Sequence, residues 1–367
     1  MINQLSLVPR QHTPFWISAA SLIGGIGLGL LLATWVLLAS GVDFKGIINE
    51  FVLYSFTNNR GLSQTLTKGS VLLLVGMASA VALKLRFWNI GVDGQVWFGA
   101  LAATGIAIHD IGPPSIRLWL MATAAIIAGA FWIGIPVLLR LKLGVNEVIS
   151  TLMLSYVAFL VVQSALYGDW RDPSTSFPVT ENFDVNAERL SQVGFGHLHS
   201  GIWISLFASV VVSYLMLMSR FGFYLTAVGL NLRGAKAAGL PVSIVIIFTT
   251  LIAGGLCGLA GFTIVAGQEF RLTQYIAHNY TFSAILIAFL ARFNPVAVIP
   301  VAFIVAGLFT AGDSLKTFYQ LPLATIQIVE SLILLSVVAV DFFARYTISL
   351  NRVDSKVVSI NSIAGPH

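Results

Sequence analysis

Several stretches of this chain are apolar and uncharged over lengths that cross a lipid bilayer, and they restrict its fold more than any other feature. A helix needs about 20 apolar residues to span the hydrocarbon core. Only 10% of the 367 residues are charged and 57% are hydrophobic, whereas a soluble domain carries about 25% charged residues. Lipid is therefore the solvent of much of the chain, and in lipid a helix satisfies its own backbone hydrogen bonds. The sequence predicts an all-α, polytopic membrane protein.

The apolar stretches predict about ten transmembrane helices in a single domain over residues 1–367. The predicted helices cover residues 15–39, 70–83, 96–108, 118–139, 148–166, 202–218, 243–267, 281–290, 295–311 and 323–343. The second, third and eighth of these are short for a span, so we expect them to be extended, tilted or broken in the folded protein.

Lys and Arg side chains predict the orientation, because cytoplasmic loops carry an excess of them. With the N-terminus inside, the inner loops hold more Lys and Arg than the outer ones, and most Asp and Glu residues fall outside. Both termini are then cytoplasmic. Residues 168–200 form a long extracytoplasmic loop, and residues 219–242 form a long cytoplasmic one. The net charge of +5 reflects basic inner loops rather than binding to nucleic acid.

Motifs for common enzyme chemistry are missing from the sequence. It has no GxxxxGK(S/T) phosphate loop and no HExxH zinc helix. His197 and His199 lie in the outer loop without a carboxylate at the spacing of a zinc site, and the lone Cys257 forms no intramolecular disulfide. We therefore expect no catalytic residue, no metal and no cofactor on this chain. Transport or signalling across the membrane remains.

One polar segment, RFWNIGVDGQ at residues 86–95, lies between two short apolar runs. It places Asn89 and Gln95 near membrane depth, next to Trp88. Irregular backbone at that depth is tolerated only where it is buried in protein or lines a water-filled cavity. The segment is therefore a candidate lining of a transport pathway. The alternative is an ordinary cytoplasmic turn, since Arg86 marks the membrane interface.

A second polar stripe follows the helix predicted from residue 148. At 100° per residue, Ser155, Tyr156 and Gln163 lie on one side of this helix, with Phe159 between them. A mixed polar and aromatic face suits a pathway for a polar solute. It suits hydrogen bonding between helices equally well, so both interpretations stay open.

Glu330 is a third candidate, because it interrupts an otherwise uncharged predicted helix. A carboxylate inside a membrane is costly unless it is paired or hydrated. It therefore faces either the pathway or a partner on another helix. By contrast, the pairs Gly25/Gly29 and Gly254/Gly258 have the GxxxG spacing of helix packing contacts and indicate no function of their own.

The cytoplasmic loop 219–242 has glycines near both ends and a partly helical pattern between them. A spanning protein without a nucleotide site, but with such a helix, is suited to being moved by another protein. An amphipathic helix resting on the bilayer surface is the alternative for this loop.

Together these segments resemble the permease subunits of bacterial ABC importers for nucleosides and simple sugars, within the ribose-type branched family. The resemblance covers about residues 68–343 and is carried by WNIGVDGQ at 88–95, NEVISTLMLSY at 146–156, RDP at 171–173, AVGLN at 227–231 with residues 235–240, and NP at 294–295. NEVIS and RDP favour the nucleoside branch. Asp93 stands where the family usually has Glu, and Ser155 where it has Asn, which affects fine substrate preference.

The resemblance implies a pore made with a second permease subunit in the bacterial plasma (inner) membrane. It also implies a cytoplasmic ABC ATPase, which binds the ATP, and an extracytoplasmic substrate-binding protein. Residues 229–239 would be the coupling helix that sits in a groove of the ATPase. The coupling residues implied in this region are Ala227, Gly229, Asn231, Arg233, Ala235, Lys236, Ala238 and Gly239.

These features combine into one functional prediction, an ATP-driven nucleoside importer. The predicted substrate pathway is lined by aromatic and polar side chains and one carboxylate: Trp88, Asn89, Gln95, Ser155, Tyr156, Phe159, Gln163 and Glu330. A ribose-type permease for simple sugars is the alternative. An ion-coupled secondary transporter ranks below both, since it needs paired ionisable residues at mid-membrane and only Glu330 qualifies.

Overall fold

The computed structural model describes residues 2–9, 15–274, 276 and 280–353. The chain forms two compact units. One unit combines Met1–Asp43 with Pro322–His367, and the other covers Phe44–Leu321. Both chain ends, which the sequence predicts to be cytoplasmic, include residues outside the described ranges.

Helices make up nearly all of the regular structure. The elements are β1 (Ile2–Pro9), α1 (Phe15–Ala39), α2 (Phe44–Ile48), the π-helix η1 (Asn49–Tyr54), α3 (Ser55–Thr57), α4 (Asn59–Lys84), α5 (Val92–Ile108), α6 (Pro114–Leu143), α7 (Glu147–Tyr167), α8 (Gly201–Leu217), α9 (Arg220–Leu230), α10 (Leu232–Ala237), α11 (Val242–Ile264), the π-helix η2 (Val265–Glu269), α12 (Tyr280–Leu290), α13 (Pro295–Phe318), α14 (Leu323–Arg345) and β2 (Tyr346–Val353). The predicted helical fold is confirmed. The short antiparallel ribbon of β1 and β2, with Ile2 opposite Val353, is an addition that the sequence pattern did not indicate.

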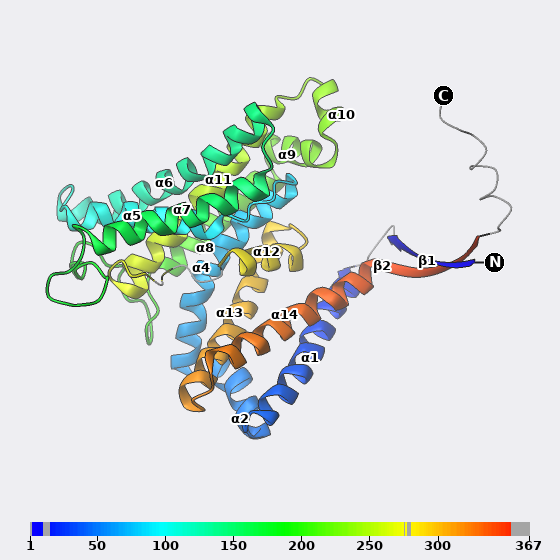
Figure 1. The fold of residues 1–367 in the computed structure, drawn as a ribbon, viewed down its shortest axis with the longest axis horizontal. Coiled ribbons are helices and arrows are strands. Elements are labelled where there is room, and N and C mark those ends of the chain that lie inside the picture. Colours follow the sequence, from blue (N-terminus) through cyan, green and yellow to red (C-terminus); the bar gives the residue numbers. More distant parts are fainter. Residues whose placement is uncertain (1, 10–14, 275, 277–279, 354–367) are drawn as a thin grey trace. The chain divides into compact units, whose positions relative to one another are not determined.

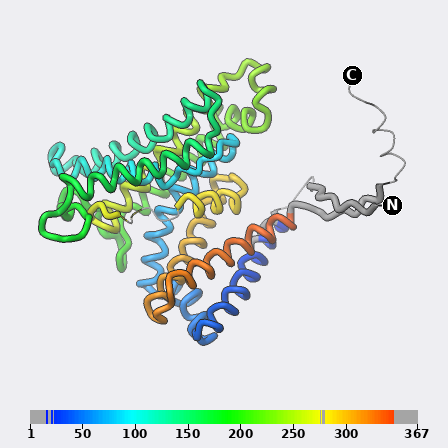
Figure 2. The backbone as a smooth tube through the Cα atoms, viewed as in Figure 1, coloured from blue at the N-terminus to red at the C-terminus, as the bar shows by residue number. Residues whose placement is uncertain are grey.

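In the unit that contains both chain ends, α1 and α14 lie side by side and antiparallel (Figure 2). A Cβ atom added to Gly25 would lie 2.6 Å from the Cα atom of Val337. One added to Gly29 would lie 2.6 Å from the Cα atom of Ile333. The two helices therefore meet through their backbones, and the packing role predicted for this glycine pair is confirmed.

Helix α4 is the centre of the other unit. Every residue from Gly69 to Leu83 is buried, and a helix that is apolar on all sides belongs inside a bundle. Helices α11, α12 and α13 pack against it, while α5 and α6 pack against α11 (Figure 1). The helix begins at Asn59, eleven residues before the predicted start at residue 70, because its first turns are polar and carry no hydropathy signal.

Helices α5, α6 and α11 cross at glycines that let their backbones touch. A Cβ atom on Gly129 of α6 would lie 2.2 Å from the Gly254 carbonyl oxygen, and one on Gly258 would lie 2.0 Å from the Ala125 carbonyl oxygen. Gly99 of α5 approaches the same Gly258. The packing role predicted for Gly254 and Gly258 is confirmed, and one small-residue face of α11 serves two neighbours.

The described residues contain six helices long and apolar enough to cross a bilayer, or seven if the bent pair α8 and α9 is one span. They are α4, α6, α7, α11 with η2, α13 and α14. Each of the ten predicted segments falls on a helix, but α5 has 17 residues and α12 only 11. Seventeen residues reach about 26 Å, less than the ~30 Å hydrocarbon core. Helix α1 has 25 residues, and its part Ile23–Ala39 is apolar. Six or seven spans therefore replace the predicted ten in the described part of the chain.

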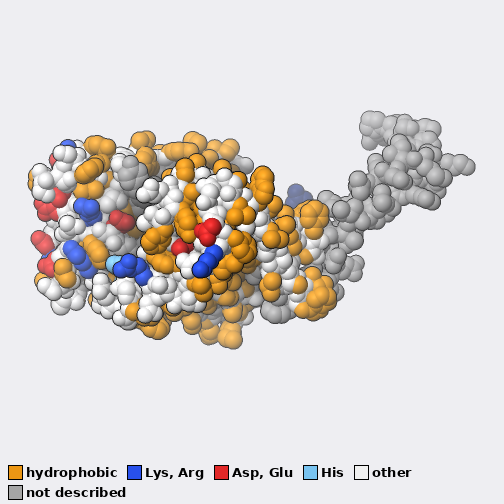
Figure 3. All heavy atoms as spheres, turned by 90° about the horizontal axis from the view of Figure 1, so that it is seen from below, with side chains coloured by type: hydrophobic (Ala, Val, Ile, Leu, Met, Phe, Trp, Pro, Cys, Tyr) orange, Lys and Arg blue, Asp and Glu red, His pale blue; other side chains and the backbone are white. Residues whose placement is uncertain are grey.

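Large apolar side chains remain on the outside of the bundle. Phe131, Trp203 and Phe207 are each more than 60% exposed, and they lie on α6 and α8. Hydrophobic side chains are spread over the face drawn in Figure 3, with charged side chains in fewer places. A surface of this kind is stable against lipid rather than water, so the structure is that of a multi-pass membrane protein.

Two glycines on α6 test the importance of the backbone contacts. We expect Gly129→Ala to destabilise the protein by about 1–3 kcal/mol, because the new methyl group overlaps the backbone of α11. Gly134→Ala is the matched control, since its Cβ would lie 3.9 Å from the nearest atom, a Leu251 methyl group. Thermal unfolding of the purified variants in detergent compares the two. Equal midpoints would show that the crossing is not tightly packed.

Candidate functional site

The polar segment predicted at residues 86–95 is partly irregular and partly helical. Helix α4 ends at Lys84 and α5 begins at Val92, so the irregular backbone covers residues 85–91. Within it, the Asn89 Nδ2 donates to the Gln95 Oε1 at 3.1 Å, and the Gln95 Nε2 donates back to the Asn89 Oδ1 at 2.9 Å. The two amides thus form a closed pair that holds the irregular segment onto the first turn of α5.

Side chains of α7 provide partners for the backbone of this segment. The Ile90 amide donates to the Thr151 Oγ1 at 3.2 Å, and the Gly94 amide donates to the Ser155 Oγ at 3.3 Å. The Asn89 Oδ1 accepts from the Gly91 amide at 3.0 Å. The NIGVDGQ and NEVISTLMLSY segments, about 60 residues apart in sequence, therefore form one hydrogen-bonded unit.

Two further contacts tie the unit to α6 and α12. The Arg140 guanidinium pairs with the Glu147 carboxylate at 3.0 Å and lies 5.3 Å from the Phe87 ring centre. On the other side, the Asp93 amide donates to the Thr281 Oγ1 at 3.1 Å, and the Thr281 amide donates to the Asp93 Oδ1 at 3.2 Å. Four helices thus converge on the segment.

The predicted pathway residues in this region differ in exposure. Asn89 and Gln95 are 2% and 1% exposed, and in this conformation their amides bind each other rather than facing an open passage. Trp88, Tyr156 and Phe159 are exposed, by 43%, 61% and 37%. The structure therefore separates the predicted set into a buried amide pair and exposed aromatic rings.

Aromatic neighbours extend the set on two sides. Trp88 lies 5.9 Å from Phe289 of α12, between ring centres, and Phe289 lies 5.2 Å from Phe293. Phe159 meets Trp97 of α5 edge to face at 5.8 Å. The rings of Trp88 and Phe159 therefore join different aromatic groups.

The two remaining predicted pathway residues are Gln163 and Glu330. Gln163 is partly buried on α7, and among the described residues its Oε1 has no hydrogen-bond partner. Glu330 is partly buried on α14, in the unit that contains both chain ends.

The predicted site lacks Thr151 and Thr281, although Thr151 accepts from the irregular backbone at Ile90 and Thr281 accepts from the first turn of α5 at Asp93. Thr151 lies within the NEVISTLMLSY segment, and its side-chain role depends on a neighbour that only the fold supplies. Thr281 is the second residue of α12, and no local pattern links it to Asp93.

The predicted coupling segment consists of two helices instead of one. Helix α9 ends at Leu230, and Asn231 adopts an extended conformation (φ −151°, ψ 100°) before α10 begins. The Asn231 Oδ1 accepts from the Gly234 amide at 2.9 Å and so caps α10. Helix α10 is therefore a separate helix that runs in a different direction from α9, at one end of the bundle (Figure 1).

Almost all residues of α10 are exposed. Arg233, Lys236 and Ala238 are exposed, and only Ala235 is buried, against the bundle. Gly239 leaves the helix with φ +76°, a conformation that favours glycine.

Helix α9 contacts the end of α4 through Gly229. A Cβ atom there would lie 2.2 Å from the Lys84 carbonyl oxygen, so only glycine permits this approach. Gly229 is buried and Ala227 is partly buried on the same helix. Because Lys84 is the last residue before the irregular segment, α9 touches the backbone that leads into the hydrogen-bonded unit.

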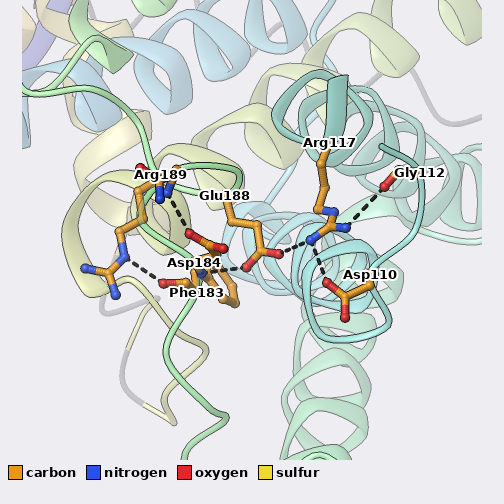
Figure 4. Close-up of polar contacts among 8 residues, drawn as sticks. Asp110, Gly112, Arg117, Phe183, Asp184, Glu188 and Arg189 are labelled. Atoms are coloured by element: carbon orange, nitrogen blue, oxygen red, sulfur yellow. Dashed lines mark hydrogen bonds and ion pairs between the residues drawn. The ribbon is translucent and has the colours of Figure 1, made fainter. Parts of the chain in front are cut away.

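The long loop 168–200 is held to the bundle by a buried ion pair (Figure 4). The Arg117 Nη1 lies 2.8 Å from the Glu188 Oε1 and 2.6 Å from the Asp110 Oδ1, and Arg117 and Glu188 are 7% and 5% exposed. The Glu188 Oε2 also accepts from the Asp184 amide at 2.8 Å. This arrangement orders a loop that contains no helix or strand in the described residues.

The histidines of the same loop do not form a metal site in the described part of the chain, which contains no group of three His, Cys, Asp or Glu side chains placed to hold an ion. His199 is buried, and its Nδ1 accepts from the Gly201 amide at 3.1 Å. Burial lowers the pKa of the His199 imidazole to about 4, so the ring is neutral at pH 7.

The apolar helices, the buried polar junction and the exposed end helix together define a multi-pass membrane permease. The chain belongs to the family described as branched-chain amino acid transport system / permease component, which matches residues 61–338. The predicted resemblance is confirmed: the protein is a transport component of the ABC permease class.

Three relatives show the range of the family. A glucose ABC transporter permease protein of Haloferax volcanii is 32% identical, over 95% of this chain and 94% of the relative. A guanosine ABC transporter permease protein of Bacillus subtilis is 29% identical, over 84% and 90%. A nucleoside ABC transporter permease protein of Lactococcus lactis is 27% identical, over 79% and 82%. The relatives thus share the transporter class and differ in the cargo that their names state.

Removal of one member of the amide pair tests the hydrogen-bonded unit. We expect Asn89→Ala to cost about 1–3 kcal/mol of stability, because it leaves the Gln95 amide and the Gly91 N–H buried without a partner. Gln95→Met should cost less, since the Asn89 Oδ1 still accepts from Gly91. The exposed Gln192 provides the control change Gln192→Met, for which we expect less than about 0.5 kcal/mol. Unfolding midpoints in detergent rank the three, and a different order would contradict the geometry.

Proposed function

We propose that this chain is the membrane permease subunit of an ATP-driven importer whose cargo is a nucleoside. The observation that carries the proposal is the exposed helix α10, which stands free at one end of the bundle while α9 reaches the end of α4. Such an element transmits motion to the bundle but performs no chemistry itself.

The coupling mechanism follows from this geometry. An ATPase that binds α10 would move it through Asn231 into α9, and from Gly229 to the end of α4 at Lys84. The next residues form the irregular segment, which donates to the Thr151 side chain of α7, and the first turn of α5, which donates to the Thr281 side chain of α12. Helices joined in this way move as packed bodies with two discrete arrangements.

Partners and location complete the proposal. ATP is bound by a separate cytoplasmic ATPase, the pore is completed by a second permease subunit, and an extracytoplasmic binding protein delivers the cargo. Loop 168–200, ordered by the pair of Arg117 and Glu188, then faces the binding protein. The termini lie in the cytoplasm, and the membrane is the plasma membrane of a bacterium.

Nucleosides match the chemistry of the predicted pathway, because they combine a flat base with a ring of hydroxyl groups. Trp88, Tyr156 and Phe159 offer exposed rings, and stacking of a base on such a ring is worth about 1–3 kcal/mol. The guanosine and nucleoside permeases among the relatives support this cargo. The glucose permease among them supports a simple sugar as the second candidate.

Coupling is tested at Ala238, which is exposed and follows the last residue of α10. We expect Ala238→Trp to lower cargo uptake severalfold while membrane insertion stays normal, because a bulky ring prevents close docking of the ATPase. Ala238→Ser is the matched control and should transport normally. The measurement is uptake and cargo-stimulated ATP hydrolysis in reconstituted vesicles. Full coupling in the Trp variant would exclude α10 from the interface.

Cargo is tested at Trp88 with guanosine and glucose as labelled solutes. We expect Trp88→Ala to reduce guanosine uptake severalfold, since it removes the ring on which a base stacks, and Trp88→Phe to retain most of it. Assembly with the ATPase serves as the control. If the unchanged protein takes up glucose but not guanosine, its cargo is a simple sugar and not a nucleoside.

A further inference from the structure

A cavity of about 600 Å³ lies at the end of the bundle opposite α10, where η1, the start of α4 and the end of α13 meet (Figure 1). Its wall combines a carboxylate, a guanidinium, two amides and aromatic rings, from Glu50, Arg60, Asn49, Asn58, Tyr54 and Phe318. Polar groups that converge on one cavity with aromatic rings are the usual form of a site for a small solute. None of these residues belongs to the predicted pathway.

Glu50 is the buried acid of this wall. It is 4% exposed, and in the described part of the chain no Lys or Arg side chain pairs with it. The Asn49 Nδ2 donates to its Oε1 at 2.9 Å, and the Ser314 Oγ donates to its Oε2. A carboxylate accepts about four hydrogen bonds, so two acceptor positions are left. A buried carboxylate without a cation is stabilised by further donors, and a solute in the cavity would provide them.

Donors of the protein line the same cavity. The Arg60 side chain is exposed and forms no ion pair among the described residues. The Asn58 Oδ1 accepts from the Arg60 amide at 2.9 Å, which leaves the Asn58 Nδ2 as a donor. Glu50 and Arg60 give the wall one negative and one positive charge. A charged ligand would meet one like charge, whereas a neutral ligand that both donates and accepts hydrogen bonds suits both residues.

Aromatic rings provide the apolar part of the cavity. Tyr54 and Phe318 meet edge to face with their ring centres 5.9 Å apart, and Phe318 is 61% exposed. Tyr54 and Glu50 both lie on the π-helix η1, a rare conformation that often occurs at functional sites. One short element therefore brings a ring and a carboxylate to the same cavity.

We infer that this cavity binds the hydroxylated ring of a sugar or a nucleoside. The ring hydroxyls donate to the Glu50 carboxylate and accept from Arg60 and Asn58, and the apolar face of the solute packs on Phe318. The inference rests on the proposed function, because a hydroxylated ring is the feature that both candidate cargoes share. Since α10 marks the proposed ATPase side, the cavity lies on the side from which imported cargo arrives.

The test measures binding of glucose and guanosine to the purified full-length chain in detergent by saturation-transfer NMR and calorimetry. We expect Phe318→Ala to weaken binding about tenfold, because the solute loses a ring to pack on. Phe131→Ala is the matched control, since Phe131 is equally exposed, at 62%, and lies on α6 away from the cavity. A dideoxy analogue of guanosine, which lacks the ring hydroxyls, should bind at least about tenfold more weakly than guanosine.

Two polar variants test the hydrogen bonds. Glu50→Gln should weaken binding about tenfold, because a bond to a charged acceptor is about twice as strong as a neutral one. Arg60→Gln changes an exposed side chain, so its folding is not at risk, and it should weaken binding as well. Binding of glucose alone would identify a simple sugar as the ligand, and binding of guanosine alone would identify a nucleoside. No binding of either solute, or unchanged affinity in Phe318→Ala and Arg60→Gln, would overturn the inference.

Two further measurements separate this site from the pathway and from the proposed function. Trp88→Ala should leave binding at the cavity unchanged. Loss of binding in Trp88→Ala, with normal binding in the cavity variants, would place the solute in the pathway and refute the cavity site. Reconstituted vesicles with the ATPase that take up neither solute would refute the importer but not the binding. Normal uptake without binding at the cavity would refute the inference alone.

Discussion

Backbone groups inside a membrane protein must find hydrogen-bond partners within the protein, because lipid offers none. Residues 85–91 leave the helical pattern between α4 and α5: the first three N–H groups donate to carbonyls of α4, the Ile90 N–H donates to Thr151 of α7, and the Gly91 N–H donates to the side chain of Asn89. In the first turn of α5, the Asp93 and Gly94 N–H groups donate to the side chains of Thr281 and Ser155. The positions of α5, α7 and α12 therefore depend on one short irregular segment.

The surrounding helices pack in a way that suits movement as whole bodies. Where α5, α6 and α11 cross, glycines bring the backbones into contact. Helix α9 uses the same device at Gly229, where it touches the end of α4. A displacement of α9 reaches the irregular segment through one backbone contact, and α10, beyond the break at Asn231, is the exposed part that a partner would hold.

The differences between sequence prediction and structure have a common cause. Hydropathy finds apolar stretches but does not measure how far a helix continues into polar residues or how deep it lies. The hydropathy pattern therefore predicted too short a helix for α4, which begins with polar turns at Asn59. It also counted α5 and α12 as spans, although they have only 17 and 11 residues. In the same way the glycine-bounded loop predicted one helix, whereas the side chain of Asn231 caps a second one and divides the segment.

The sequence by itself determined the membrane class, the helical fold, the packing role of the paired glycines and the transporter family, because these depend on composition, periodicity and local motifs. It also marked Asn89, Gln95 and Ser155 as members of one predicted pathway. Only the tertiary structure decided that Asn89 and Gln95 are bound to each other and buried, and that Asp93 pairs with Thr281. The physical reason is that hydrogen bonds depend on distance in space, which no local pattern encodes.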